Sequence, residues 1–356
     1  MVSLYVGSTS GYSGKSLVSM GLGQRFKKDG FKVGYFKPVG ALPVKVDNTL
    51  TDKDAWFIYR VLGLKDPLAE ICPVVLTHDL TVKAYLKDIK GLLGKVTKSY
   101  RVLSKDKDIM IVGGYGSIYS GAILGISGLK VIKRLNAKVV MVVKYEGEYC
   151  VDYILEAKES LKNRFIGVIL NRVTLEHKQS VEDYIAPFLK RKGVDILGIL
   201  PHDSIVGSVK VEELNDMLGG KVLCGQNRLD NLVEHFLIGA MQVDKAMEYF
   251  KRTRNNAVIV GGDRADIQLS AIESGTECLV LTGNLYPNDI ILARAEQRGV
   301  PILVVREDTY SIAKRVERLS VRLRLRDKAK VAQGMALIME NVDFPLLYKK
   351  LGVKMA

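Results

Sequence analysis

Six short apolar runs, each separated from the next by enough chain for a helix, most constrain the fold of this sequence. They are nearly continuously hydrophobic, which is typical of strands that are covered on both faces. Strands joined by helical crossovers form a parallel sheet, so the pattern predicts an α/β layered domain. The six runs are Val2–Val6, Lys32–Phe36, Asp108–Val112, Lys138–Val143, Phe165–Leu170 and Asp195–Leu200.

A second alternation begins after a break at Pro201-His202-Asp203. Residues 204 to about 254 are expected to be more helical, with a turn at Gly219-Gly220. The strands and helices expected after them are Ala257–Val260, Asp266–Ser274, Glu277–Leu281, Asn288–Arg298 and Pro301–Val305. The length of 356 residues suits two domains, predicted over residues 1–203 and 204–326. Residues 327–356 are expected to form a helical tail that docks on the second domain.

One segment rich in glycine and serine carries the strongest chemical signal, because it follows a predicted strand and opens a predicted helix. Its glycines let successive backbone N–H groups and the helix N-terminus point at one anion. Lys15 would then approach the β- and γ-phosphates of a nucleotide, and Ser16 would offer its hydroxyl to Mg²⁺. The candidate nucleotide-binding residues here are Ser10, Gly11, Tyr12, Ser13, Gly14, Lys15 and Ser16. The strict phosphate-loop spacing is not met at Thr9, so a glycine-rich turn without a ligand stays an alternative.

The segment Gly7–Ser16 resembles the phosphate loop of dethiobiotin synthetase and of the cobyrinic acid diamide synthases. Further similar segments follow in the same order: Gly34–Val39, Lys53–Ala55, Ile71–Pro73 and Val168–Arg172. The resemblance implies a P-loop NTPase-type, mostly parallel sheet flanked by helices. It also implies that Lys37 lies at the reacting centre and that Asp54 binds Mg²⁺. Asn171 would read the adenine of ATP, and Arg172 beside it is a further candidate nucleotide-binding residue.

Each of these residues also has an interpretation without a ligand. Lys37 can be a surface lysine after a strand, and Asn171 can be a turn residue at a strand end. Asp54 can be a helix N-terminal acid, and its neighbour Asp52 competes with it for the metal. The sequence leaves these alternatives open.

The second half of the chain is similar to another family at Val260–Leu269 and Leu281–Pro287. These segments resemble the DRTGG domain, which follows a dethiobiotin-synthetase-like domain in the non-catalytic half of long bacterial phosphate acetyltransferases. The resemblance implies a smaller, regulatory α/β domain in a stand-alone protein of the phosphotransacetylase family without the acetyltransferase domain. Its candidate ligand residues are Gly261, Gly262, Asp263, Arg264, Thr282 and Asn284. The alternative is a pair of unliganded turns with Asp263 as a helix cap.

Two departures from the related families bear on turnover. Gly113 stands where the synthetases have a glutamate that binds Mg²⁺. Without that acid the metal would be held by Ser16, Asp54, phosphate oxygens and water, so binding can survive while turnover suffers. Ser10 stands where related dimer-switch ATPases carry a second lysine, which argues against a motor of that type.

The net charge of +14 is compatible with anionic ligands. The densest basic stretch comprises Lys314, Arg315, Arg318, Arg322, Arg324, Arg326, Lys328 and Lys330. Its period-two part, Val321–Arg326, predicts a strand, and a solvated face or a subunit contact is favoured over nucleic-acid binding because no aromatic residues are interleaved. The uncharged run Ile109–Leu129 holds six glycines, so it predicts a strand and a loop rather than a membrane span. Four scattered cysteines and the lack of a signal-peptide pattern favour the cytosol.

The sequence therefore predicts a cytosolic protein that binds Mg²⁺ and ATP and carries a ligand-sensing DRTGG domain. It would couple the nucleotide to a small anionic metabolite or a partner protein, and it is expected to form a homodimer. The alternative is an active ATP-dependent carboxylase or amide ligase of the dethiobiotin or cobyrinic acid a,c-diamide synthase type. A third alternative is a structural partner in acetyl-phosphate metabolism with an empty loop. Whether the protein is an enzyme is left open.

Overall fold

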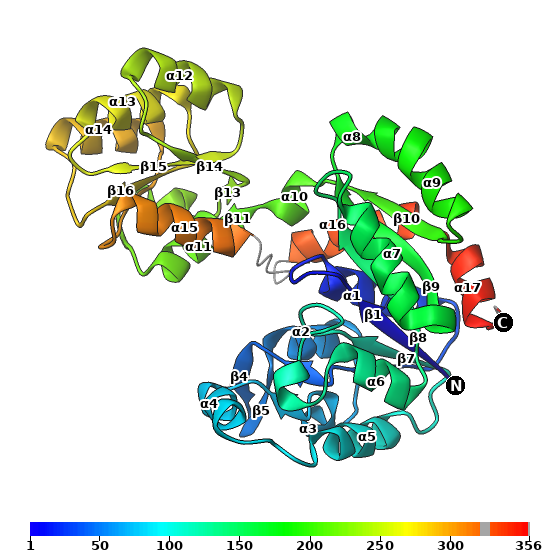
Figure 1. Cartoon of the computed structure of the whole chain (residues 1–356). Helices are drawn as coiled ribbons and strands as arrows, with labels where there is room; N and C mark the ends of the chain where they lie inside the picture. The colour runs from blue at the N-terminus through cyan, green and yellow to red at the C-terminus, as the bar shows by residue number, and fades with distance from the viewer. Residues whose placement is uncertain (321–327, 355–356) are drawn as a thin grey trace. The chain divides into compact units, whose positions relative to one another are not determined.

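The computed structural model describes residues 1–320 and 328–354 and divides the chain into two compact units (Figure 1). The first unit comprises Met1–His202 together with Val331–Ala356. The second unit, Asp203–Lys330, is inserted between these two segments. The first unit is therefore built from two parts of the chain that are far apart in sequence.

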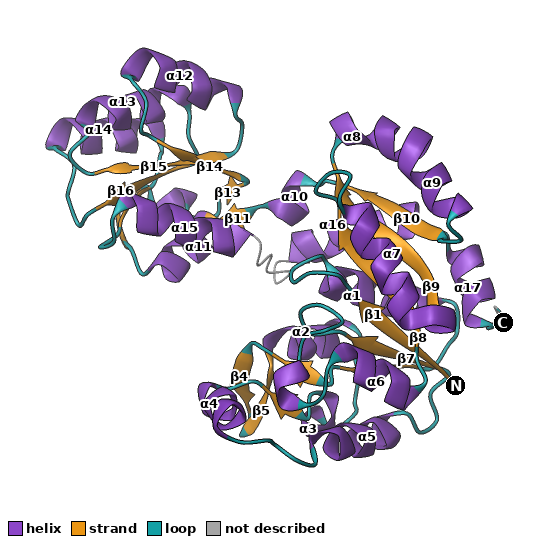
Figure 2. Ribbon diagram, in the orientation of Figure 1, coloured by secondary structure: helices purple, strands orange, loops and turns teal. Residues whose placement is uncertain are grey.

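A six-stranded sheet forms the centre of the first unit, and all of its strand pairs are parallel (Figure 2). In spatial order the strands are β10 (Ile196–Pro201), β9 (Phe165–Val173), β8 (Lys138–Lys144), β1 (Val2–Gly7), β7 (Ile109–Gly113) and β2 (Val33–Phe36). Each of the six apolar runs in the sequence forms one of these strands, so the predicted parallel α/β sheet is confirmed. The strand residues are almost all buried, as expected for a sheet with helices on both faces.

Helices and two small sheets surround the central sheet of the first unit. The helices are α1 (Lys15–Lys28), α2 (Lys53–Val61), α3 (Leu68–Ile71), α4 (His78–Leu86), α5 (Leu92–Leu103), α6 (Gly128–Leu135), α7 (Cys150–Leu161), α8 (Leu175–Ser180), α9 (Ala186–Arg191), α16 (Lys328–Asn341) and α17 (Phe344–Leu351). A π-helical turn, Val181–Ile185, joins α8 to α9. The small sheets pair β3 (Val39–Gly40) with β6 (Val74–Val75), and β4 (Pro43–Val46) with β5 (Thr49–Asp52). Short 3₁₀ turns occupy Ala122–Leu124 and Lys162–Arg164.

The C-terminal helices pack on the first unit, and the prediction that they dock on the second domain is wrong. Val342 forms an antiparallel bridge with Gly198 of the edge strand β10. The ring of Tyr348 lies against Phe26 and Phe31, and its hydroxyl donates a hydrogen bond to Asp29. The apolar pattern of the tail indicates that these side chains are buried, but it carries no information about which core receives them.

A five-stranded sheet forms the centre of the second unit. Its strands are β12 (Lys221–Cys224), β17 (Ile302–Val304), β16 (Cys278–Thr282), β15 (Asn256–Gly261) and β14 (His235–Ile238). The edge strand β12 is antiparallel to β17, and the other pairs are parallel. The sequence predicted β15, β16 and β17 but assigned β12 and β14 to a mainly helical stretch. A further pair joins β11 (Val209–Lys210) to β13 (Leu232–Val233).

Alternate residues of these strands supply two hydrophobic layers, one on each face of the sheet. Val258, Val260 and Leu279 lie in one layer, and Ile259 and Val280 lie in the other. The helices that cover the sheet are α11 (Val211–Leu218), α12 (Val243–Arg252), α13 (Ala265–Ser274), α14 (Asp289–Arg298) and α15 (Thr309–Ser320). The short helix α10 (Ser204–Gly207) and a 3₁₀ turn, Gln226–Arg228, complete the unit.

The basic stretch of the sequence is only partly described. The strand predicted at Val321–Arg326 lies outside the described residues. Arg315 is bound to Glu307 and donates to the carbonyl of Met217 at 2.6 Å, and the buried Lys330 donates to the carbonyl of Ser208 at 2.8 Å. These two side chains therefore make contacts within the second unit.

The uncharged run from Ile109 to Leu129 forms strand β7, a glycine-rich loop and the start of α6. No helix in the described parts of the chain has the length and apolarity needed to cross a membrane.

Candidate functional site

The glycine-rich segment connects the central strand β1 to helix α1, so it lies at the carboxyl edge of the sheet. Two of its residues have left-handed backbone conformations: Tyr12, with φ 57°, and Gly14, with φ 97°. A Cβ atom on Gly14 would come within 2.2 Å of Nδ2 of Asn171. Gly14 is therefore required by the left-handed turn, and it leaves room for the Asn171 side chain at the end of β9.

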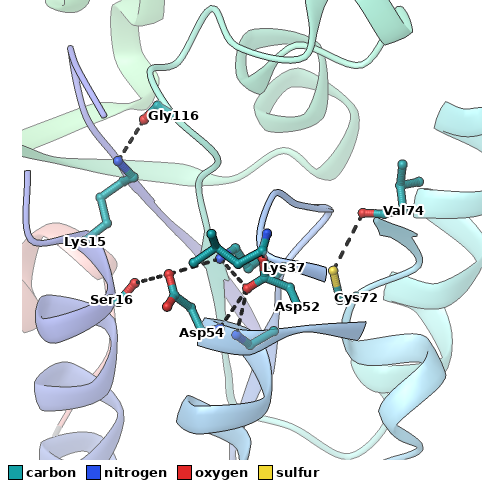
Figure 3. Close-up of polar contacts among 10 residues, drawn as sticks. Lys15, Ser16, Lys37, Asp52, Asp54, Cys72, Val74 and Gly116 are labelled. Carbon is teal, nitrogen blue, oxygen red and sulfur yellow. Dashed lines mark hydrogen bonds and ion pairs between the residues drawn. The ribbon is translucent and has the colours of Figure 1, made fainter. Parts of the chain in front are cut away.

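The ammonium group of Lys15 is buried in this loop and is surrounded by neutral oxygen atoms (Figure 3). It donates to Oγ of Ser8 at 2.6 Å, to the carbonyl of Gly116 at 2.7 Å and to the carbonyl of Ser10 at 3.4 Å. Burial, helped by the nearby charge of Lys37, lowers the pKa of Lys15 to about 8 despite the opposing effect of Asp54. Keeping Lys15 charged in this buried position therefore costs free energy, and a bound anion would offset that cost.

Ser16 and Asp54 lie side by side at the first turns of α1 and α2. The Ser16 hydroxyl donates to Oδ2 of Asp54 at 3.2 Å. The Asp54 side chain is 42% exposed, so this carboxylate can be reached from solvent. A hydroxyl and a carboxylate are hard oxygen donors of the kind that Mg²⁺ prefers.

Asp52 and Lys37 form a buried ion pair next to Asp54, with Lys37 Nζ 2.6 Å from Oδ1 of Asp52 and 3.5 Å from Oδ2 of Asp54 (Figure 3). Burial opposes the charge on Lys37, but Asp54 and Asp52 outweigh it and raise the pKa of Lys37. Asp52 is fully buried, caps α2 by accepting from the N–H groups of Asp54 and Ala55, and also accepts from the N–H of Leu42. Its carboxylate is fully engaged, which leaves Asp54 as the metal candidate of the two.

Asn171, at the end of β9, contacts the phosphate loop directly. Its side-chain Nδ2 donates to the carbonyl of Ser13 at 2.8 Å, and its Oδ1 accepts from the backbone N–H of Arg172 at 2.9 Å. The reading of adenine by Asn171 stays a prediction, and the observed contact is to the loop backbone. Nη2 of Arg172 is buried and has no hydrogen-bond partner among the described residues, and burial lowers the pKa of this side chain.

Gly113, the residue that replaces the synthetase glutamate, lies against Tyr35 of the adjacent strand β2. A Cβ atom on Gly113 would come within 2.4 Å of the Tyr35 hydroxyl oxygen. Tyr35 is buried, and burial raises the pKa of its phenol, so the group stays neutral. A neutral phenol therefore fills the room that a side chain at position 113 would need. Cys72, also buried nearby, donates through Sγ to the carbonyl of Val74 at 3.6 Å (Figure 3).

Sequence reasoning missed three residues of this site: Ser8, Gly116 and Tyr35. Ser8 lies within the recognised loop, so its position was available as a signal. Gly116 is 101 residues away from Lys15 and contributes only a backbone carbonyl. No residue type at position 116 could have predicted that contact.

The candidate loops of the second unit follow β15 and β16, which are neighbours in the sheet with Gly261 opposite Thr282. The two loops therefore share one edge. Gly262 packs so closely on Leu285 that a Cβ atom would come within 2.4 Å of the Leu285 carbonyl oxygen. The Thr282 hydroxyl shares a hydrogen bond of 2.7 Å with the hydroxyl of Thr309.

The cation of this second site is already paired. Arg264 donates through Nε and Nη2 to the two carboxylate oxygens of Asp266, at 3.1 and 3.0 Å. Arg264 also occupies the N-cap position of α13, so the alternative interpretation of Asp263 as the cap is wrong. Asn284 has a left-handed backbone with φ 56° and donates its N–H to the carbonyl of Val305.

Comparison with known families assigns the first half of the chain. Residues 2–210, more than half of the sequence, match the family model described as an AAA domain. The chain belongs to this AAA-domain family. Residues 213–319 match the DRTGG domain, so the resemblances found in both halves of the sequence are confirmed.

Two curated relatives illustrate these matches. The phosphate acetyltransferase of Synechocystis sp. is 25% identical over 359 residues, covering 96% of this chain and 50% of the relative. The ATP-dependent dethiobiotin synthetase of Brachyspira hyodysenteriae is 26% identical over 222 residues, covering 60% of this chain and 96% of the relative. This AAA-domain chain thus spans about half the length of the phosphate acetyltransferase that it matches.

Among solved structures, a nucleotide-binding protein from Archaeoglobus fulgidus in complex with ADP is 17% identical to this chain. The alignment covers 57% of this chain and 82% of that protein, with a TM-score of 0.34.

Proposed function

We propose that the AAA domain binds a magnesium nucleotide, with ATP as the expected form. The observation that carries this proposal is the Lys15 ammonium, which is buried, has a lowered pKa and, among the described residues, is held by neutral oxygens of Ser8, Ser10 and Gly116 alone. A phosphate oxygen would supply the missing negative charge. The helix N-terminus that begins at Lys15 would add its partial positive charge to the same anion.

The residues beside the loop also fit a magnesium ion. Ser16 and Asp54 present two oxygen ligands that are 3.2 Å apart, and Asp54 is accessible to solvent. Mg²⁺ usually keeps several waters and takes one or two protein ligands together with phosphate oxygens. When bound, the ion would neutralise phosphate charge. Ser16 and Asp54 would orient it, and the Lys37 ammonium lies 3.5 Å from the Asp54 carboxylate on the side of β2.

Two features favour binding over rapid turnover. The neutral Tyr35 phenol fills the space beside Gly113, so this strand end offers no carboxylate to the metal. The Lys37 ammonium is tied to the fully buried Asp52 at 2.6 Å, which restrains it from meeting a substrate. Both features support a protein that holds its nucleotide.

Isothermal titration of Mg-ATP into wild type, Lys15→Ala and Lys28→Ala tests the proposal. Lys28 is an exposed lysine on the same helix, so it controls for the loss of one charge. We expect Lys15→Ala to weaken binding by at least about tenfold, because a hydrogen bond to a charged group contributes about 1.5–3 kcal/mol. Lys28→Ala should bind like wild type. Equal binding by all three proteins would reject the site.

An ATP-dependent carboxylase or amide ligase is the second candidate function. Lys37, Asp54 and Ser16 form a continuous line of contacts from the end of β2 to the phosphate loop, which would suit a substrate placed next to the nucleotide. Release of phosphate from ATP that depends on an added diamine or carboxylic acid would favour this function. If no phosphate is released with any metabolite of such a panel, nucleotide binding remains as the proposed function of this site.

For the DRTGG domain we propose ligand sensing by the two loops that share one edge of its sheet. The exposed Arg264–Asp266 pair could exchange Asp266 for a small anion at little cost, because exposed ion pairs are weak. Native mass spectrometry of purified protein would identify a retained molecule, and its binding should weaken in Arg264→Gln. We also propose a cytosolic location, which the four free, buried cysteines support. The homodimer stays a prediction that sedimentation would check.

A further inference from the structure

A second positively charged site lies between α5 and α6, two neighbouring helices of the first unit (Figure 1). A cavity of about 370 Å³ opens there. Four of its lining residues are cationic: Lys98, Arg101, Lys105 and Arg134. No acidic residue lines it in the parts of the chain that the structure describes.

The four cationic side chains line the same cavity, although they come from two helices and the segment after one of them. Lys98 and Arg101 are one helical turn apart on α5, and Lys105 follows the C-terminal end of that helix. Arg134 reaches the cavity from α6, where its Nε donates to the hydroxyl of Thr97 at 3.3 Å. None of the four cations forms an ion pair with an acidic side chain of the described residues, whereas the exposed Arg252 and Arg298 on other helices do.

Stabilisation of helix C-termini does not account for the whole arrangement. Cations in the last turn of a helix interact favourably with its dipole, which explains Arg101 and Arg134 in part. Lys98 lies in the middle of α5, beyond the range of that effect. Four like charges around one concave surface repel one another, so the free cavity is unfavourable until an anion enters it.

The cavity is separate from the phosphate loop. Helix α5 is followed in the chain by β7, and helix α6 is followed by β8. The C-terminal ends of both helices therefore lie near the amino ends of the parallel strands. The phosphate loop follows the carboxyl end of β1. In a parallel sheet these two ends are opposite edges, and one ligand of nucleotide size does not reach both.

We propose that this cavity binds a small, multiply charged anion that carries phosphate or carboxylate groups. Its volume falls within the roughly 300–1,000 Å³ of small-molecule sites. The guanidinium groups of Arg101 and Arg134 each present a planar fork that matches a phosphate or a carboxylate. The lining has no aromatic residue on which a base could stack, which favours a compact anion over single-stranded nucleic acid.

Titration of inorganic tripolyphosphate into Lys15→Ala protein tests the proposal, because this background removes the contribution of the phosphate loop. Citrate serves as the carboxylate probe. The test variant adds Arg101→Gln and Arg134→Gln, and the matched control adds Lys95→Gln and Lys133→Gln. The control removes the same charge from exposed positions of the same two helices that do not line the cavity.

We expect one binding event that weakens at least about tenfold in the test variant and less than about twofold in the control. Binding should also weaken as salt is raised. Binding of tripolyphosphate or of citrate with this pattern supports the site and identifies the preferred group. Three results overturn it: neither probe binds, both variants lose binding equally, or a single-stranded oligonucleotide binds the same arginines more tightly than either probe. Because Lys15 is absent throughout, failure here leaves the proposed nucleotide site untouched.

Discussion

The two glycine-rich strand-to-helix turns of this protein look alike in sequence and differ in what surrounds them. At the first turn, the hydrogen-bond partners of the buried cation Lys15 in the described part of the chain are neutral oxygens, and the accessible Asp54 carboxylate lies near it. At the second turn, the cation Arg264 is exposed and already bound to Asp266. Gly14 is required by a left-handed φ, whereas Gly262 is required by packing against Leu285. An anion at the first turn would therefore meet a cation held by neutral groups, whereas an anion at the second turn would have to displace Asp266 from Arg264.

Alanine substitutions at the two glycines should separate these roles and give the largest effects. Gly14→Ala adds about 1–3 kcal/mol of backbone strain and displaces the Asn171 amide, so Mg-ATP binding should weaken by at least tenfold. Gly262→Ala overpacks the second unit and lowers its free energy of unfolding by about 1–3 kcal/mol. It should therefore lower the denaturation midpoint and leave Mg-ATP binding unchanged. Titration calorimetry and urea unfolding measure both quantities. If Gly262→Ala weakened nucleotide binding as much as Gly14→Ala, the distinction between the turns would fail.

The pH dependence of nucleotide binding should reveal the state of Lys15. Its pKa is about 8 in the free protein, below the value of 10.5 for an ordinary lysine, and bound phosphate would raise it. Binding should therefore take up a proton above pH 8, and affinity should fall by up to about tenfold per pH unit there.

Without nucleotide, the same pKa affects folding stability. Between pH 8 and 10.5 the unfolded chain binds more protons at Lys15 than the folded protein does, so the Lys15 contribution to the free energy of unfolding rises with pH across that window.

Calorimetry in buffers of different ionisation enthalpy at pH 7.5 and 9 measures this proton uptake. The Lys15→Ala protein is the control and should show no such uptake from this group. Identical affinities at both pH values, with no buffer dependence, would contradict the account of Lys15.

The smallest effect is expected at Asn171, where two roles can be told apart. If its main role is to hold the Ser13 carbonyl at 2.8 Å, Asn171→Ala should weaken Mg-ATP and Mg-GTP by a similar factor of about three to ten. If the residue reads adenine, Mg-ATP alone should weaken. Parallel titrations with the two nucleotides decide between them.

The sequence predicted the parts of the fold that local patterns determine. The six apolar runs became six parallel strands because their residues are almost all buried on both faces of the sheet. Strands β12 and β14 were missed because each has only one buried residue, so burial leaves little pattern in their sequence. The docking of the tail was predicted wrongly because the position of Tyr348 against Phe26 depends on tertiary packing alone.

At the candidate site, the residue types were predictable and their partners were not. The phosphate loop, Ser16, Asp54 and Asn171 were identified from motifs, and the structure places all of them together. The choice between Asp52 and Asp54 needed the structure, because burial and capping by Asp52 are tertiary facts. The filling of the space beside Gly113 by Tyr35 also depends on the pairing of β2 with β7.

The discontinuous first unit has a consequence for synthesis. Gly21 and Leu17 of α1 pack against Ile338 and Gly334 of α16, with glycine on one side of each contact. The ribosome synthesises the inserted unit, Asp203–Lys330, before most of α16. The face of α1 that α16 covers is therefore not yet covered by it while the inserted unit is made. The first unit thus completes the packing around α1 only after the whole second unit has been synthesised.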